Sequence, residues 1–174
     1  MDYLTIVTTG GTIDKIYFDD KSDFQIGAPQ IGDILTALGV GFRFLVIPLL
    51  RKDSLHISDD DRDLVARTIE AQPGRHVLVT HGTDTMVETA RVLTRMKENC
   101  SVMTGALNPA RFQGSDAVFN IGCAVGAVQT LDNGVYVVMG NNHFVMQAIA
   151  DGEPERAKDY VAWLLNATQG YAIK

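Results

Sequence analysis

Short apolar segments alternate with amphipathic segments along most of this chain, and this alternation restricts the possible folds more than any other feature. The apolar segments are rich in β-branched residues, which favour strands. The predicted strands cover residues 3–9, 42–49, 76–80, 101–105 and 135–140. The predicted helices cover residues 29–38, 59–72, 84–98, 117–131 and 154–166, and Ser58 is the expected cap of the second.

Strands that alternate with helices in this way predict a parallel sheet with helices on both faces. We therefore expect one α/β domain over residues 1–174, a doubly wound, three-layer α/β/α sandwich of about five strands, flavodoxin- or Rossmann-like. The expected strand order is 2-1-3-4-5, with strands numbered along the chain. Ligands of such sheets bind beyond the carboxyl ends of the strands where the winding reverses, here between strands 1 and 3.

The composition excludes several classes of function. The net charge of −6 argues against a nucleic-acid partner, which requires clustered Lys and Arg. No apolar run approaches a membrane span, and the first residues, MDYLTIVTT, lack the basic start of a signal peptide, so we expect no membrane partner and a cytoplasmic location. Cys100 and Cys123 form no CxxC pair and the four histidines are dispersed, so we expect neither a metal nor a cofactor.

Two polar segments follow the strands that flank the predicted reversal point. Residues 8–14, TTGGTID, follow the first strand, and residues 81–85, HGTDT, follow the third. The proposed strand order makes these loops neighbours. We therefore expect Thr12, Thr83 and Asp84 to converge on one small volume.

Three interpretations of these loops are open. Phosphate binding would require a Gly-Lys-Ser/Thr ending or a GxGxxG fingerprint, and the chain has neither. Structural turns are the second interpretation, because Gly-Gly pairs and threonines are common in loops. The third is nucleophilic chemistry, in which Thr12 attacks, backbone N–H groups beside glycines such as Gly11 and Gly82 approach an oxyanion, and Asp84 pairs with an ammonium group.

The two segments together resemble the paired signatures of the L-asparaginase/glutaminase family of bacterial type. The matching residues are TGGTI at 9–13 and HGTDT at 81–85. The resemblance continues through VMTGALNP at 102–109, SDAVFNI at 115–121 and GVYVVM at 134–139. It covers about residues 3–140, the larger N-terminal domain of the family. The chain is most similar to short, single-domain members, because the smaller C-terminal domain of longer members is absent.

The resemblance implies a role for each matching residue. Thr12 is the nucleophile that forms an acyl-enzyme, Thr83 lies across the substrate near the attacking water, and Asp84 holds the α-amino group. Ser54 helps to bind the substrate carboxylate, and the backbone at Ala106 contacts the side-chain amide. The implied substrate is L-asparagine, and the implied products are ammonia and L-aspartate.

Three positions depart from the family pattern. Phe24 stands where the family has a tyrosine near the nucleophile, so we expect Tyr17 to supply the hydroxyl or, alternatively, to pack under the loop. The family lysine after the fifth strand is missing, and the candidate replacements are Lys15, Lys158 and His143. Leu55 follows Ser54 where longer members often carry an amide.

We therefore expect an amidohydrolase that acts on L-asparagine. The alternatives are a non-catalytic or weakly active binder of acidic amino acids or their amides, and an amidase for glutamine or another amide. We expect residues 13–28 to form a polar lid over Thr12. A homodimer or homotetramer is the expected assembly, and the small-residue helix at 117–131 is either its interface or simply part of the core.

Overall fold

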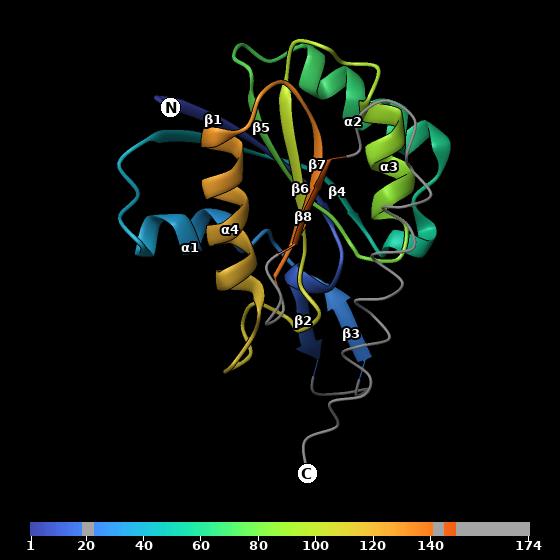
Figure 1. The fold of residues 1–174 in the computed structure, drawn as a ribbon. Helices are drawn as coiled ribbons and strands as arrows, with labels where there is room; N and C mark the ends of the chain where they lie inside the picture. The colour runs from blue at the N-terminus through green and yellow to red at the C-terminus, as the bar shows by residue number, and fades with distance from the viewer. Residues whose placement is uncertain (19–22, 141–144, 149–174) are drawn as a thin grey trace.

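The computed structural model describes residues 1–18, 23–140 and 145–148. Its central sheet contains five parallel strands: β1 (Tyr3–Gly10), β4 (Arg43–Lys52), β5 (His76–Thr80), β6 (Cys100–Thr104) and β7 (Gly134–Met139). The spatial order is β4-β1-β5-β6-β7, which confirms the predicted order (Figure 1). A sixth strand, β8 (Val145–Ala148), adds to β7 in the antiparallel direction and was not predicted.

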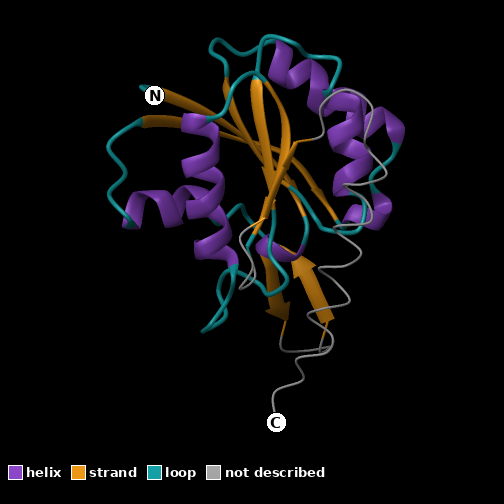
Figure 2. Ribbon diagram, viewed as in Figure 1, coloured by secondary structure: helices purple, strands orange, loops and turns teal. Residues whose placement is uncertain are grey.

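Helices cover both faces of this sheet, as the alternation predicts (Figure 2). On one face lie α1 (Ile31–Ala37) and α4 (Ala117–Thr130), and on the other lie α2 (Asp59–Glu70) and α3 (Met86–Leu93). Successive residues of a strand point to opposite faces. Val7 and Val79 accordingly pack in the core under α2 and α3, whereas Ile6 and Leu78 pack in the core under α1 and α4.

The helix boundaries follow local signals. Ser58 caps α2, because its hydroxyl accepts from the backbone N–H of Asp61 while the Asp61 carboxylate accepts from the Ser58 N–H. Val65 and Ile69 of α2 are buried against the sheet, whereas Leu64 is exposed. The third predicted helix, 84–98, is shorter in the structure and ends at Leu93. The helix predicted at 154–166 lies outside the described residues.

Residues 10–28, between the first predicted strand and the first predicted helix, include the expected polar lid and contain regular structure. A 3₁₀ turn, η1 (Thr12–Asp14), leads into an antiparallel hairpin of β2 (Lys15–Phe18) and β3 (Asp23–Ile26). Acidic and polar residues between the two short apolar runs hid this hairpin from sequence analysis. The hairpin projects from the carboxyl end of the sheet, beside the carboxyl end of β1 (Figure 1).

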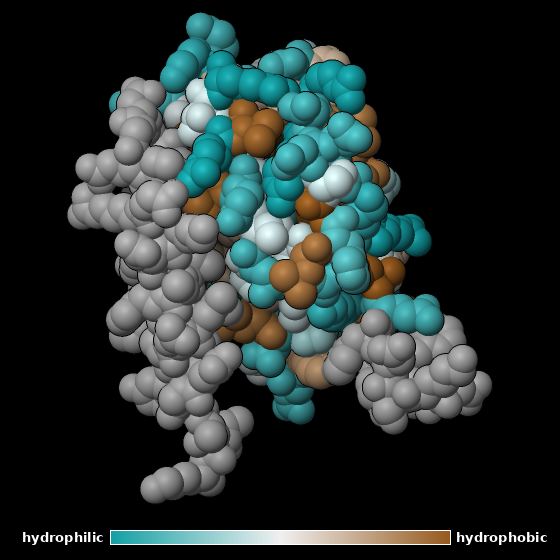
Figure 3. Space-filling model, turned by 90° about the vertical axis from the view of Figure 1, so that its right-hand side faces the viewer, coloured by the Kyte–Doolittle hydropathy of each residue, from teal (hydrophilic) through white to brown (hydrophobic). Residues whose placement is uncertain are grey.

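The two outer faces of the molecule differ in character. The face over α2 and α3 is mainly hydrophilic with separate hydrophobic patches (Figure 3). The outer side of α4 is apolar: Val118 is 44% exposed and Phe119 52% exposed. Gly122 and Gly126 of α4 also face solvent, with no atom near the position of an added Cβ. These two glycines are therefore not explained by close packing inside the described core.

Candidate functional site

The candidate site lies beyond the carboxyl ends of neighbouring parallel strands. η1 follows β1 after Gly11, a second 3₁₀ turn, η2 (Ser54–His56), follows β4, and the HGTDT segment follows β5. Residues 105–116 follow β6 and lead into α4. Because β4, β1, β5 and β6 are consecutive in the sheet, these four connections are neighbours in space. This is the reversal point that the sequence predicts as the site.

Two glycines bring the loops after β1 and β5 into direct contact. Gly11 has φ +88°, a conformation that favours glycine, and a Cβ there would lie 2.5 Å from the backbone N of Gly82. A Cβ on Gly82 would lie 2.6 Å from the Ser54 hydroxyl oxygen, so the η2 loop joins the same contact. Thr12 and Thr83 each directly follow one of these glycines. The structure thus brings together the chain segments of both predicted threonines.

Ser54 and Asp84, both predicted to bind substrate, are hydrogen-bonded to each other. The buried Ser54 hydroxyl donates to Asp84 Oδ2 over 2.9 Å. The Thr85 hydroxyl donates to the carbonyl oxygen of Ser54 over 2.7 Å, which further fixes the two loops. Asp84 itself is exposed, so its carboxylate is accessible to a cationic group from solvent. Leu55, the residue after Ser54, is also exposed.

His81 was not predicted as a site residue, although it begins the HGTDT motif. Its ring is fully buried between the Gly82 carbonyl, 2.7 Å from Nδ1, and the Thr89 hydroxyl, 2.8 Å from Nε2. Because a carbonyl only accepts, Nδ1 carries the proton and Nε2 accepts from Thr89. Burial lowers the pKa of His81 to about 4, against a smaller upward effect of the bond to Gly82. His81 is therefore neutral at pH 7 and ties the Gly82 backbone to α3.

Asp14, two residues after Thr12, is a second site residue that sequence analysis missed. Its Oδ1 accepts from the backbone N–H of Gln30 over 2.9 Å, and its carbonyl accepts from Gly27 N–H over 2.8 Å. Burial raises the pKa of Asp14 to about 6, although the Gln30 bond and nearby Arg51 act in the opposite direction. Its backbone and side chain together close the base of the hairpin. An acidic residue in a nominally polar loop gave no signal of this burial.

The connection after β6 forms another wall of the site. Ala106 is buried, and the preceding Gly105 packs so closely on the His81 carbonyl that a Cβ has no room. Further along, the backbone N–H of Ala110 donates to the carbonyl of Ile13 in η1 over 3.1 Å. The segment that carries Ala106 therefore touches both the HGTDT loop and the turn that contains Thr12.

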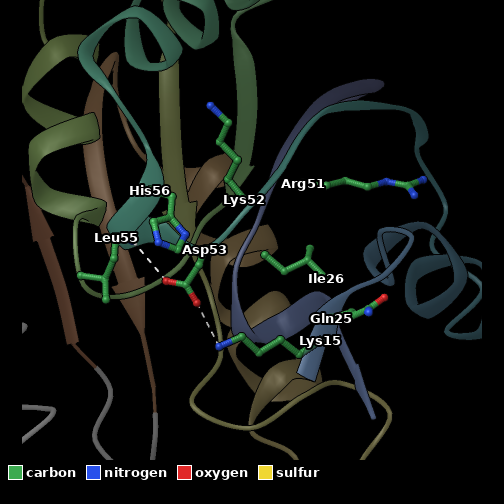
Figure 4. A pocket seen from close by; sticks show the side chains of 8 residues that line it. All are labelled: Lys15, Gln25, Ile26, Arg51, Lys52, Asp53, Leu55 and His56. Carbon is green, nitrogen blue, oxygen red and sulfur yellow. Dashed lines mark hydrogen bonds and ion pairs between the residues drawn. The ribbon is translucent and has the colours of Figure 1, made fainter. Parts of the chain in front are cut away.

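Lys15 joins the hairpin to the η2 loop. Its ammonium lies 3.0 Å from Asp53 Oδ2, and Figure 4 shows these two side chains pointing toward each other. Burial acts to raise the pKa of Asp53, but the bonds from Lys15 and from the Leu55 N–H outweigh it and lower that pKa. A cavity of about 560 Å³ opens beside this pair; it is lined by Lys15, Gln25, Ile26, Arg51, Lys52, Asp53, Leu55 and His56. The side chains of Arg51 and Lys52 extend away from the Lys15–Asp53 pair (Figure 4).

Some predicted site features lie beyond what the structure describes. Tyr17 stands in β2, in register with Phe24 of β3, but the side chains of both are outside the described part. His143 and Lys158 are likewise outside the described residues. Within the described ranges, no three residues of the types that bind metals are grouped together. None of the described helices has the length and hydropathy needed to cross a membrane.

Known proteins are similar to this chain over most of its length. The family model described as asparaginase, N-terminal, matches residues 3–153. An L-asparaginase from Bacillus licheniformis is 34% identical over 130 residues, 70% of this chain and 40% of the relative. A glutaminase-asparaginase from Acinetobacter glutaminasificans is 25% identical over 167 residues, 86% of this chain and 49% of the relative. The chain thus spans less than half the length of these curated relatives.

Solved structures agree with the sequence comparison. The thermostable L-asparaginase from Thermococcus kodakarensis matches with a TM-score of 0.69 and 26% identity, over 86% of this chain and 52% of that one. A probable cytoplasmic L-asparaginase from Campylobacter jejuni matches with a TM-score of 0.68 and 27% identity, over 81% of this chain and 47% of that one. The chain belongs to the asparaginase family, of which it matches the N-terminal domain.

Proposed function

We propose that this protein is an amidohydrolase that converts L-asparagine to L-aspartate and ammonia through a threonine nucleophile. The Thr12 hydroxyl oxygen attacks the side-chain amide carbon, the carbon–nitrogen bond breaks, and ammonia leaves with the hydroxyl proton. Water then attacks the resulting ester and releases aspartate, and Thr12 regains its proton. Thr83 lies across the substrate from Thr12, beside the attacking water.

The remaining predicted residues bind the substrate in this proposal. Asp84 accepts from the α-ammonium group, and Ser54 contributes to the site of the α-carboxylate. Backbone groups at Gly11, Gly82 and Ala106 surround the amide, and the Tyr17 hydroxyl assists Thr12. A small zwitterion fits a site that combines one carboxylate with hydroxyl and backbone N–H groups.

The mutual contact of the three loops is the observation that carries this proposal. Gly11, Gly82 and Ser54 meet within van der Waals distance, and Ser54 bonds to Asp84. Thr12 and Thr83 directly follow the two contact glycines, and Asp84, whose carboxylate is exposed, directly follows Thr83. Two structural turns that did not contact each other would not require glycine at both Gly11 and Gly82.

The test is ammonia release from L-asparagine by the purified protein and by Thr12→Ala. We expect the variant to lose about 10³-fold or more of kcat, because no other group replaces the attacking oxygen. Thr36→Ala is the matched control, since Thr36 is an exposed helical threonine whose hydroxyl bonds only its own helix. Equal rates for wild type and Thr12→Ala would refute the role of Thr12.

Glutamine or another amide is the second substrate to test, because one relative is a glutaminase-asparaginase. One additional methylene changes transition-state binding by only about 1–3 kcal/mol. The ratio of kcat/KM for L-asparagine to that for L-glutamine therefore decides the preference. A ratio below one would replace asparagine by glutamine as the proposed substrate.

One feature of the site supports the alternative function, in which the protein binds the amino acid but does not hydrolyse it. Among the described residues, Asp84 bonds the Ser54 hydroxyl and forms no ion pair with a lysine. Calorimetric titration with L-aspartate separates the two functions: saturable heat without ammonia release identifies a binder. Saturable heat together with ammonia release from asparagine supports the enzyme.

We also propose that the chain acts as one domain over residues 1–174, in the cytoplasm, as a homodimer or homotetramer. The Campylobacter jejuni relative, a probable cytoplasmic L-asparaginase, supports the location. The apolar outer side of α4 supports self-association, because no Asp, Glu, Lys or Arg occurs between residues 117 and 131 in a chain with net charge −6. Two copies repel each other less through this uncharged surface than elsewhere.

A further inference from the structure

Asn120, in the first turn of α4, joins three separate parts of the chain beneath the candidate site. Its side chain is fully buried. Nδ2 donates to the Gly105 carbonyl over 2.9 Å and to Asp116 Oδ2 over 2.8 Å, while Oδ1 accepts from Gly140 N–H over 2.8 Å. Two acceptors face one end of the amide and a donor faces the other. This pattern fixes which end carries the nitrogen, because a flipped amide would lose all three bonds.

Asp116, which precedes α4, completes the network. Its carboxylate accepts from the backbone N–H of Leu107 over 3.0 Å and from that of Asn108 over 3.0 Å. Asn120 holds Gly105, and Asp116 holds Leu107 and Asn108, so the backbone is fixed on both sides of Ala106. Hydrogen bonds to a carboxylate are stronger than those between neutral groups.

Packing leaves the bonded segments little room to move. A Cβ on Gly140 would lie 2.6 Å from Cε1 of Phe119, and Gly105 is pressed against the His81 carbonyl. Asn120 therefore links the segment after β6 to the end of β7 at two crowded points. Two of its three bonds reach segments outside α4, so this buried amide does more than cap the start of a helix.

We propose that Asn120, acting with Asp116, is a positioning residue that holds the Ala106 backbone and the end of β7 in the geometry for amide hydrolysis. This role rests on the proposed function, because Ala106 faces the side-chain amide of the substrate in that proposal. Asn120 acts through the backbone and does not touch the substrate. Ser54 and Asp84, which are proposed to bind the charged groups of the amino acid, make no hydrogen bond to this network within the described residues.

The first experiment compares Asn120→Asp with the wild type. The substitution keeps the shape of the side chain but replaces its donor by a carboxylate, which then faces the Asp116 carboxylate and the Gly105 carbonyl. We expect the Ala106 segment to shift and kcat to fall about 10- to 100-fold, since small displacements of a reacting group have effects of this size. KM should change by less than about threefold, because the residues proposed to bind the charged groups are on other loops.

Gln129→Glu is the matched control. Gln129 is on the same helix, is exposed, and bonds only the Val125 carbonyl of its own helix. The same change from amide to acid at this position should leave both kcat and KM within about twofold of the wild type.

Amide hydrogen exchange provides a measurement that does not depend on turnover. We expect Asn120→Asp to accelerate exchange at Leu107, Asn108 and Gly140, with no change at those amides in Gln129→Glu. Asp116→Asn is the second variant should Asn120→Asp fail to fold. Asp116→Asn keeps one acceptor oxygen, so we expect a smaller loss of kcat, about 3- to 10-fold. Hydrogen exchange should be accelerated at the same amides.

The outcomes separate this inference from the proposed function. A wild type that releases no ammonia from asparagine or glutamine refutes the proposed function, and with it a role of Asn120 in hydrolysis. An active wild type with unchanged kcat in folded Asn120→Asp refutes the positioning role alone. A fall in kcat together with an equal rise in KM also refutes it, because that pattern reports a general disturbance of the site.

Discussion

Two buried ionisable residues beside the candidate site, His81 and Asp14, have shifted pKa values. As the pH changes, the two shifts alter the free energy of unfolding in opposite directions. His81 is neutral in the fold, with its pKa lowered from 6.5 to about 4. Asp14 is more easily protonated in the fold, with its pKa raised from 3.8 to about 6. For both residues, the folded and the unfolded chain differ in the number of protons bound over nearly the same interval, about pH 4 to 6.5.

For His81, the unfolded chain binds more protons than the folded chain between pH 6.5 and 4. The contribution of His81 to the free energy of unfolding is therefore present above pH 6.5 and falls by about 3 kcal/mol as the pH drops to 4. His81→Asn retains a donor for the Gly82 carbonyl but does not titrate. We expect urea unfolding at pH 7 and pH 4 to show that the stability difference between wild type and variant shrinks by about 3 kcal/mol at the lower pH. Parallel pH profiles would contradict the burial of a neutral imidazole.

For Asp14, the folded chain binds more protons between pH 3.8 and 6. Its contribution is fully present below pH 3.8 and is lost as the pH rises through 6, again by about 3 kcal/mol. Asp14→Asn keeps the acceptor for Gln30 N–H but cannot ionise. We therefore expect the stability of this variant, relative to wild type, to rise by about 3 kcal/mol from pH 3.5 to pH 7. Because the contributions of His81 and Asp14 oppose each other, the free energy of unfolding of the wild type should vary little over the interval in which both titrate. A stability difference between Asp14→Asn and wild type that stays constant with pH would exclude a raised pKa of Asp14.

At the scale of secondary structure elements, the contact between the loops after β1 and β5 depends on glycine for two separate reasons. Gly11 combines φ +88° with ψ −173°, and an added Cβ would overlap the Gly82 backbone. Gly39 also has a positive φ, +62°, but open space surrounds its Cβ position. Comparing Gly11 with Gly39 therefore separates the effect of backbone strain from the effect of steric overlap.

Replacing each glycine by alanine tests this distinction. We expect Gly39→Ala to lower the free energy of unfolding by about 1–2 kcal/mol through backbone strain alone. Gly11→Ala should lower it by more than about 3 kcal/mol and should abolish turnover, because the two loops must separate. Chemical denaturation of both variants, with ammonia release from L-asparagine, makes the comparison. Equal destabilisation of the two would show that the loops are not in contact.

The parts of this fold that the sequence predicted are those with regular periodicity. The five buried strands and the cap at Ser58 have local signals, and the strand order follows from the rules for parallel sheets. The hairpin β2–β3 was missed because each of its strands has only four residues within a polar segment. Asp14, His81 and Asn120 were missed because their importance depends on burial by distant segments, which no local pattern records.

At the scale of the whole molecule, the exposed apolar surface is unevenly distributed. Phe112, Val118 and Phe119 are exposed on or just before α4, whereas the α2 and α3 side is mainly hydrophilic. A shallow apolar groove of about 580 Å³ runs along α4, lined by Val118, Phe119, Gly122, Cys123, Gly126, Ala127 and Thr130. Apolar surface of this kind favours an interface with a second copy.

Val118→Lys tests self-association through α4. Val118 is exposed, so a lysine there should change the stability of one subunit by less than about 0.5 kcal/mol. In a symmetric dimer it would place two ammonium groups in the apolar contact, and we expect the sedimentation coefficient to fall to that of a monomer. Leu64→Lys, on the hydrophilic side, is the control. An unchanged sedimentation coefficient for Val118→Lys would place the interface elsewhere.

The edge strand β4 has a consequence for how molecules of this protein meet at high concentration. β4 pairs only with β1 within the described part of the chain, and Pro48 near its middle has no backbone N–H to offer to an incoming strand. Arg43, Arg51 and Lys52 add positive charge along the same margin. Proline and positively charged residues on an edge strand disfavour pairing with a strand of another molecule, so we expect this margin to resist fibril growth.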